Sequence, residues 1–254
     1  MNFIDEIIKK FFGSKNIEIP LKNEVKPEPQ KETKIEQITK PIKIEEVKKE
    51  LDTVNDGNGS KPDWSYILDN CWLDDNVRSE VEKTCNRINK VKSRYETLES
   101  ITNIPWYAFA IWHLRECNLD FKACLHNGDL AIGNGKKTWN VPKDRGPFNT
   151  FEEAAIDATV TLKKLNLIKN WDAKKVIEIS EKFNGLGYRN KIGDSGKIEY
   201  SPYITAGTNW SDETGKYVSD GKFDKTAKEK QLGILAILIG LGVVKENKPT
   251  QITS

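Results

Sequence analysis

Hydrophobic residues at helical spacing mark the first predicted element, at the start of the chain. The apolar positions recur every three or four residues and are Phe3, Ile4, Ile7, Ile8, Phe11 and Phe12. We therefore predict an amphipathic helix over residues 1–13. Its apolar stripe can pack on the chain itself, on another protein or on a membrane surface. Because only Lys9 and Lys10 supply basic charge, the membrane is the less favoured of these surfaces.

The pattern changes after residue 13. Residues 14–63 contain no Phe, Tyr or Trp, hold five of the ten prolines and are dense in Lys and Glu. Such a segment buries too little apolar surface to offset the entropy lost on ordering. We predict a disordered linker over residues 14–63 and a flexible tail over residues 246–254.

Helical periodicity returns at Trp64, and we predict one folded domain over residues 64–245. A long amphipathic helix is indicated by Val77, Val81, Cys85, Ile88 and Tyr95. Pro105 starts the next helix, since proline is favourable in a first turn. The apolar face of this second helix consists of Trp106, Phe109, Ala110, His113 and Cys117. Glu116 lies beside that face, in the last turn.

From residue 118 to residue 148 the chain is rich in turn sequences such as NGD and GNG, which predict a small hairpin or an irregular lobe. Thr150 and Glu153 form a capping box that opens a helix through Leu165. Another helix opens at Asn170 or Asp172 and stops at Gly185. A loop rich in Gly and Tyr follows to residue 221, and a last helix is predicted from residue 225 to residue 241. The fold class is therefore mainly α with a small β-hairpin (α+β).

Charge and cysteine content narrow the function. The formal net charge is +2, from 40 basic and 38 acidic residues, which argues against a nucleic-acid partner. The four cysteines form no C-x-x-C pair, so the sequence predicts no metal site and no cofactor. Buried free thiols are expected, although Cys117 and Cys124 could pair if a turn joins them.

Two hydrophobic stretches bear on localisation. The N-terminus has early acidic residues and no continuous apolar region, so it does not read as a secretory signal. Leu232 to Val244 is too short to span a bilayer and predicts a buried helix. We expect synthesis in the cytoplasm.

Glu116 is the first candidate for chemistry. A carboxyl group at the end of an apolar helix is partly desolvated, which raises its pKa and keeps it protonated as a general acid. The alternative is an ordinary exposed glutamate near a helix end. The following LHNGDL segment can bring Asp129 towards Glu116, where a second carboxylate could be a nucleophile, a general base or an electrostatic stabiliser.

Several later segments have the composition of a sugar-binding groove. Amide groups hydrogen-bond to hydroxyls, glycine allows close backbone approach, and aromatic rings on loops cover the apolar face of a sugar. The expected substrate-binding residues are His126, Asn127, Asn184, Gly185, Tyr188, Tyr203, Asn209 and Tyr217. Plain surface loops are the alternative for each of them.

Six segments, in this order, resemble a bacteriophage and bacterial cell-wall lysozyme family. They are IPWYAFAIWHLRECNLDF, LHNGDL, VPKDRGPFNTFEEAAIDA, FNGLGYRN, SPYITAGTN and GKYVSDG. That family is similar to the goose-type lysozymes and lytic transglycosylases of the lysozyme-like superfamily. The resemblance covers roughly residues 95–235, more than half of the chain.

The resemblance implies a lysozyme-like fold that cleaves the β-1,4 bond between N-acetylmuramic acid and N-acetylglucosamine, with Glu116 as the general acid. It also implies that Asn184 and Tyr188 match a substrate-groove motif. Two departures are visible. Cys117 stands where related transglycosylases usually have Ser, and the goose-type relatives often lack a second catalytic carboxylate, so Asp129 has no assured role. Attack by water, or by the substrate's own 6-hydroxyl to give an anhydro sugar, both stay open.

The leading interpretation is a phage-type endolysin, a monomer whose partner is the glycan strand of peptidoglycan, released at lysis or carried on a virion. Two alternatives belong to other classes. One is a non-catalytic wall-binding module on the same fold, and the other is a cysteine peptidase that uses Cys117 or Cys124 with His113 or His126.

Overall fold

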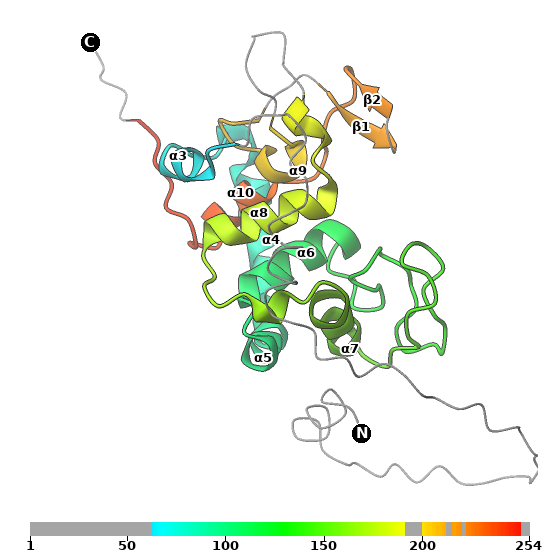
Figure 1. Ribbon diagram of the computed structural model, residues 1–254. Coiled ribbons are helices and arrows are strands. Elements are labelled where there is room, and N and C mark those ends of the chain that lie inside the picture. Colours follow the sequence, from blue (N-terminus) through cyan, green and yellow to red (C-terminus); the bar gives the residue numbers. More distant parts are fainter. Residues whose placement is uncertain (1–61, 191–199, 212–214, 220–221, 250–254) are drawn as a thin grey trace, which may run out of the picture. The chain divides into compact units, whose positions relative to one another are not determined.

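The computed structural model describes residues 62–190, 200–211, 215–219 and 222–249. The predicted N-terminal helix over residues 1–13 lies outside the described residues, as does the predicted linker except for Pro62 and Asp63. The described residues all belong to one compact unit, Thr53–Ser254. They are mainly helical with one small antiparallel sheet, which confirms the α+β class (Figure 1).

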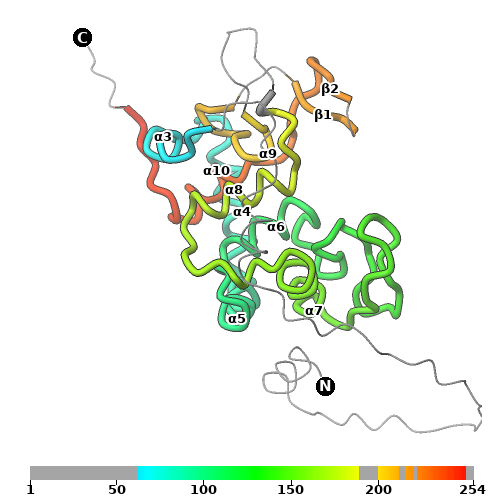
Figure 2. Tube along the Cα trace, viewed as in Figure 1, coloured from blue at the N-terminus to red at the C-terminus, as the bar shows by residue number. Residues whose placement is uncertain are grey.

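The described elements are short and follow one another along the trace in Figure 2. The α-helices are α3 Trp64–Asp69, α4 Arg78–Lys90, α5 Lys92–Thr102, α6 Trp106–Cys117, α7 Phe151–Ile156, α8 Ala173–Asn184, α9 Pro202–Thr205 and α10 Ile234–Gly240. Single turns are η1 Asp75–Val77, η2 Asp157–Leu162, η3 Leu165–Leu167 and η4 Gly187–Asn190, of which η2 is π-helical. The strands are β1 Lys216–Ser219 and β2 Lys222–Asp224.

Helix α10 is the centre of the core. Each residue from Ile234 to Ile239 is buried, and the helix contacts α4, α6, α8 and α9. A helix that is apolar on every side needs neighbours all round it, which explains this central position. The buried helix predicted within Leu232 to Val244 is therefore confirmed, with the bounds Ile234–Gly240. No helix in the described part of the chain has the length and apolarity to cross a membrane.

The predicted start of that last helix is wrong. Helix α10 begins at Ile234 and not at residue 225. Before it, the Glu229 carboxylate accepts hydrogen bonds from the backbone N–H groups of Lys230 and Gln231, both at 2.9 Å. The N–H of Gly233 donates to the carbonyl of Ala206 at 2.8 Å. These bonds hold the segment in an irregular conformation against the rest of the domain.

The predicted long helix around residues 77–95 is two helices. Helix α4 ends at Lys90 and α5 begins at Lys92. The two halves serve different neighbours, because α4 packs on α10 whereas α5 packs on α6. Both helices carry a buried apolar face. The hydrophobic pattern of the sequence therefore continues without interruption through the point at which the chain changes direction.

Three local predictions of helix ends are confirmed. The Thr150 side chain caps α7 by accepting from the Glu153 N–H at 3.2 Å, while the Glu153 carboxylate accepts from the N–H of Asn149 at 2.7 Å. Asp172, the second of the two predicted starts, caps α8 by accepting from the N–H of Lys175 at 2.7 Å. Gly185 ends α8 with a positive φ of 89°.

The small sheet does not lie where the sequence places it. Residues 118–148 form the irregular lobe of the prediction, with the isolated bridge between Ile132 and Phe148 and no hairpin strands. The described sheet pairs β1 with β2 in the segment predicted as a loop, with Tyr217 opposite Phe223. Exposed and buried residues do not alternate regularly in these two short strands. The hydrophobic pattern of the sequence therefore did not predict them.

The predicted flexible tail is anchored at its start. The Glu246 carboxylate pairs with Arg78 at 2.6 Å, and the N–H of Asn247 donates to the carbonyl of Cys71 at 2.9 Å. The Lys248 ammonium pairs with Asp75 at 2.9 Å. Residues 246–248 therefore belong to the folded domain.

Candidate active site

Glu116 lies in the last turn of α6, where its carboxyl oxygen Oε1 accepts a hydrogen bond from the Tyr203 hydroxyl at 2.8 Å. The side chain is exposed, so the predicted desolvation of this carboxyl group is wrong. The apolar residues of α6 face the core, and Glu116 faces the other way from Cys117, which is buried. The carboxyl group is thus reached by solvent and also receives one directed hydrogen bond.

The end of α6 is shaped by two backbone features. Asn118 adopts a left-handed conformation with φ 49° and stops the helix directly after the glutamate. Gly128 of the NGD turn packs against the Glu116 carbonyl, where an added Cβ would lie only 2.9 Å from the carbonyl oxygen. Gly128 also has a positive φ of 77°, so a side chain there is doubly disfavoured. The turn thus packs against the main chain of Glu116, whereas the carboxylate of Asp129, which the sequence places near the acid, is bound within the lobe.

A groove of about 600 Å³ unites five of the predicted substrate-binding residues. Its lining consists of Asn184, Gly185, Gly187, Tyr188, Tyr203, Lys216, Tyr217, Val218, Ser219 and Glu229. These residues come from the end of α8, from α9, from β1 and from the segment before α10. Tyr203 belongs to this groove and donates to Glu116, so the hydrogen bond connects the groove to the candidate acid.

The tyrosines of the groove also hold its wall together. The Tyr188 hydroxyl accepts from the N–H of Tyr217 at 2.9 Å, and the two rings meet edge to face with centroids 5.1 Å apart. An added Cβ on Gly187 would lie 3.2 Å from the Tyr217 hydroxyl, which explains why a glycine stands between the helix end and the strand. Tyr188 is buried and Tyr217 is half-buried, so Tyr217 offers the more accessible face.

Tyr203 is a buried hydrogen-bond donor. Burial raises the pKa of its phenol well above the usual value, and the negative charge of Glu116 raises it further. The hydroxyl therefore keeps its proton and donates it to the carboxylate oxygen. The guanidinium of Arg115 lies over the Tyr203 ring, 4.4 Å from its centroid.

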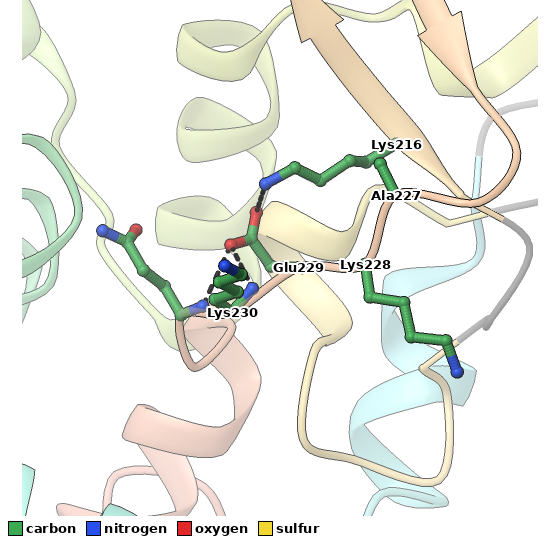
Figure 3. A pocket seen from close by; sticks show the side chains of 6 residues that line it. Lys216, Ala227, Lys228, Glu229 and Lys230 are labelled. Atoms are coloured by element: carbon green, nitrogen blue, oxygen red, sulfur yellow. Dashed lines mark hydrogen bonds and ion pairs between the residues drawn. The ribbon is translucent and has the colours of Figure 1, made fainter.

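Arg115 and Lys216 share one acidic partner. The Arg115 side chain is only 4% exposed, donates to the carbonyl of Leu232 at 3.0 Å and pairs with Glu229 Oε2 at 3.5 Å. Lys216 of β1 reaches the same oxygen at 3.5 Å (Figure 3). Glu229 and Lys216 line both the groove and a neighbouring hollow of about 530 Å³, whose lining consists mainly of charged side chains.

The charge of Glu229 follows from its contacts. Burial acts to raise the pKa of this carboxyl group, but the backbone hydrogen bonds and the charges of Arg115 and Lys216 outweigh it and lower the pKa. Glu229 is therefore an ionised carboxylate in the wall of the groove. Sequence reasoning missed it because its surroundings, KTAKEKQ, look like a solvated charged segment.

On its other side, Glu116 lines a small cavity of about 80 Å³ together with His126. Apolar walls come from Trp112, Leu125, Ala158 and Phe183, and the polar lining is completed by Thr159 and Lys163. The Lys163 ammonium lies over the Phe183 ring, 4.2 Å from its centroid. Burial lowers the pKa of Lys163, and the nearby charge of Glu116 opposes that shift.

His126 is held by an acidic partner and not by the groove. Its Nε2 lies 2.8 Å from Asp157 Oδ2, its side chain is fully buried, and its ring stacks on Phe148. Arg145 forms a two-pronged contact with the same Asp157 carboxylate. His126 therefore joins the irregular lobe to η2 beside Glu116, and the structure does not place it in the tyrosine-lined groove.

Asp129 is a structural carboxylate. It is 2% exposed, and its oxygens accept from the N–H groups of Trp139 and Asn140 at 2.7 and 2.9 Å and from the Asn140 amide at 2.7 Å. Burial acts to raise the pKa of this carboxyl group, but these hydrogen bonds prevail and lower it. Because both oxygens are engaged by the lobe, the predicted nucleophile or base role has no support in the geometry.

Two other predicted substrate-binding residues also lie outside the groove. The Asn127 amide donates to the carbonyl of Asn140 at 2.9 Å and its oxygen accepts from the N–H of Asp129 at 3.0 Å, so it shapes the lobe. The Asn209 side chain accepts from the N–H of Trp72 at 2.8 Å and donates to the carbonyl of Asn70 at 3.0 Å. Both are tied to backbone, which leaves them no free group for a sugar.

We expect Asn209→Ala to destabilise the domain and to leave its activity per folded molecule unchanged. The substitution removes two hydrogen bonds to backbone groups between α3 and η1, which corresponds to about 1–2 kcal/mol. Urea unfolding measures the free energy, and activity is compared at equal folded concentration. If Asn209→Ala instead lost substrate binding without losing stability, Asn209 would be a substrate-binding residue as the sequence predicts.

The four cysteines are buried and free, as expected, and none forms a disulfide. The Cys117 thiol donates to the carbonyl of Cys124 at 3.4 Å. Burial raises the pKa of the Cys124 thiol to about 11 and raises the pKa of Cys117 still more. Burial also lowers the pKa of His113 to about 4, and the His113 ring is bonded to the Tyr95 hydroxyl. Protonated thiols beside a neutral histidine give the cysteine-peptidase alternative no support.

In the described ranges, no three His, Cys, Asp or Glu residues come together in a way that could hold a metal ion. The site therefore consists of Glu116, the groove behind Tyr203, and the charged residues Arg115, Lys216 and Glu229, which the motifs did not reveal. Of these three, only Arg115 could be suspected from the sequence, since it directly precedes the candidate acid.

In comparisons with known proteins, no protein-family model, no curated protein and no solved structure matched this chain.

Proposed function

We propose that the chain is a peptidoglycan glycosidase with a lysozyme-like catalytic domain, acting as a phage-type endolysin on the host cell wall. The bond cleaved is the β-1,4 bond between N-acetylmuramic acid and N-acetylglucosamine, and Glu116 is the general acid. The observation that carries this proposal is the 2.8 Å hydrogen bond from Tyr203 to Glu116. It joins a proton donor at a helix end to a groove built from motifs far apart in the sequence.

The lining of the groove supports a sugar as the ligand. The Asn184 amide nitrogen donates to the Ser201 hydroxyl at 2.8 Å, so Asn184 offers its amide oxygen to a ligand. Ser219 offers a hydroxyl group and Tyr217 offers an aromatic face. Sugars present hydroxyls at their edges and C–H groups on their faces, so they need this mixture. A volume of about 600 Å³ is in the range of small-molecule clefts and suits a short stretch of glycan strand.

The mechanism needs one proton donor and one nucleophile. Protonated Glu116 gives its proton to the glycosidic oxygen as the C–O bond breaks, and the leaving sugar departs as an alcohol. The attacking oxygen, from water or from the 6-hydroxyl of the same sugar, bonds to the anomeric carbon and returns its proton to the Glu116 carboxylate. Tyr203 holds the carboxyl group in place through its donated hydrogen bond. The engagement of Asp129 in the lobe favours a mechanism with no covalent carboxylate nucleophile.

A second candidate is a module that binds wall glycan without cleaving it. The exposed position of Glu116 and the structural role of Asp129 favour this alternative, because a working general acid is often desolvated. The groove would serve either function.

Digestion of purified cell walls separates the two candidates. We expect the protein to release soluble muropeptides, and mass spectrometry of the fragments then identifies reducing ends for hydrolysis or anhydro sugars for transglycosylation. Sedimentation of the protein with walls, without any released fragment, would support the binding module and contradict the glycosidase. Mass spectrometry also reports which glycosidic bond is cut.

A further inference from the structure

The two carboxylate oxygens of Glu229 have different partners. Oxygen Oε1 accepts the N–H groups of Lys230 and Gln231, both at 2.9 Å, and so shapes the local backbone. Oxygen Oε2 faces Arg115 at 3.5 Å. Lys216 reaches the same oxygen at 3.5 Å (Figure 3). One oxygen is therefore structural and the other is ionic, which makes the two roles separable by substitution.

Arg115 connects Glu229 to the candidate acid. Its guanidinium lies between the Glu229 carboxylate and the face of the Tyr203 ring, and the side chain is almost completely buried. Its Nε atom has no hydrogen-bond partner in the described residues, so the position of the guanidinium depends on Glu229, the carbonyl of Leu232 and the ring. Tyr203 in turn donates to Glu116.

We propose that Glu229 is a positioning residue for the reaction at Glu116 and acts through Arg115 and Tyr203. This inference rests on the proposed glycosidase function. The carboxylate neutralises the buried guanidinium and fixes it over the Tyr203 ring, and the fixed ring directs its hydroxyl to Glu116. Lys216 on β1 completes the arrangement, because it ties the strand to the same oxygen.

The charge next to the acid also depends on Glu229. The titratable and charged groups around Glu116 are Tyr203 from α9, His126 from the lobe and Lys163 after η2, with Arg115 behind the tyrosine ring. If Glu229 loses its charge, Arg115 becomes an uncompensated cation near Glu116. The electrostatic surroundings of Glu116 therefore differ between the wild type and a variant that lacks the Glu229 charge.

The test is Glu229→Gln in the full chain. An amide oxygen can keep the hydrogen bonds from Lys230 and Gln231, whereas the ion pairs with Arg115 and Lys216 are lost. We expect kcat on purified walls to fall about tenfold, as for a loss of about 1.4 kcal/mol in transition-state stabilisation. Glu80→Gln on α4 is the matched control, since it removes the same charge from an exposed glutamate.

A double-mutant cycle tests the route through Arg115. If Glu229 acts by way of the guanidinium, Glu229→Gln has almost no further effect on kcat in an Arg115→Met background. Additive effects of the two substitutions would overturn the proposed route. An unchanged kcat in Glu229→Gln would overturn the positioning role itself.

A measurement without substrate keeps the inference separate from the proposed function. In ¹⁵N-labelled protein, the Arg115 Nε–H signal reports whether the guanidinium is ordered. We expect an ordered signal in the wild type and a mobile one in Glu229→Gln, with Glu80→Gln like the wild type. If walls are not cleaved but this difference is found, the glycosidase proposal fails and the contact from Glu229 to Arg115 stands. An equally ordered signal in Glu229→Gln contradicts the inference.

Discussion

We expect Glu116→Gln to lower the rate of wall lysis by about 100- to 10,000-fold, the range that a general acid contributes in enzymes. Glutamine has nearly the shape of glutamate, and its amide oxygen can still accept the Tyr203 hydroxyl hydrogen bond. It has no proton to give to a leaving glycosidic oxygen. The expected variant is therefore folded, able to bind glycan and almost inactive. Turbidity of a wall suspension and a zymogram measure the rate.

The stability of Glu116→Gln serves as the internal control. The side chain is exposed at the end of α6, so thermal unfolding should be within about 0.5 kcal/mol of the wild type. Glu80→Gln should leave both lysis and stability unchanged. Lysis by Glu116→Gln at the wild-type rate would remove Glu116 as the acid and favour another residue of the groove.

Asp129→Ala is expected to cost about 2–4 kcal/mol of stability, the largest effect on folding among the changes considered. It removes the acceptor of three hydrogen bonds to a charged carboxylate and leaves the N–H groups of Trp139 and Asn140 without that partner. The lobe beside Glu116 loosens, so activity falls together with stability. Urea unfolding followed by tryptophan fluorescence measures the change, because Trp139 is part of the affected loop.

The pH dependence gives a second test of Asp129. The folded-state pKa of this carboxyl group is lowered, so its contribution to stability is fully present above the unfolded pKa of about 3.9 and is lost as pH falls through the folded pKa. The difference between wild type and Asp129→Ala should therefore be large at pH 7 and shrink below about pH 4. Lys137→Ala, an exposed change in the same lobe, is the control. A catalytic nucleophile would behave otherwise, with activity lost and stability retained.

Helix ends with local signals were predictable from the sequence. Thr150, Asp172 and Gly185 act through hydrogen bonds and backbone conformations within a few residues of themselves, so their roles do not depend on the rest of the fold. The apolar face of α6 and the buried α10 were equally visible, because hydrophobic periodicity reports burial directly.

The groove was predictable in part. The motifs around Asn184, Gly185, Tyr188, Tyr203 and Tyr217 carry the aromatic, amide and glycine residues that such a groove needs, and the structure brings them together. Asn127, Asp129 and Asn209 have equally suitable chemistry but bind backbone groups. A polar residue of a given type can bind a ligand or stabilise a loop, depending on which groups lie next to it in the folded protein. The sequence alone does not show which groups these are.

The sequence by itself determined which stretches of the domain are buried, and that a glutamate lies in the last turn of an apolar helix. Only the tertiary structure decided that the chain turns at Val91, that strands form at residues 216–219 and 222–224, and that Glu229 pairs with Arg115 across 114 positions of sequence. Burial and helix ends depend on neighbours along the chain. Ion pairs, hydrogen-bond partners and exposure depend on which surfaces meet after folding, and the exposed position of Glu116 follows from that meeting.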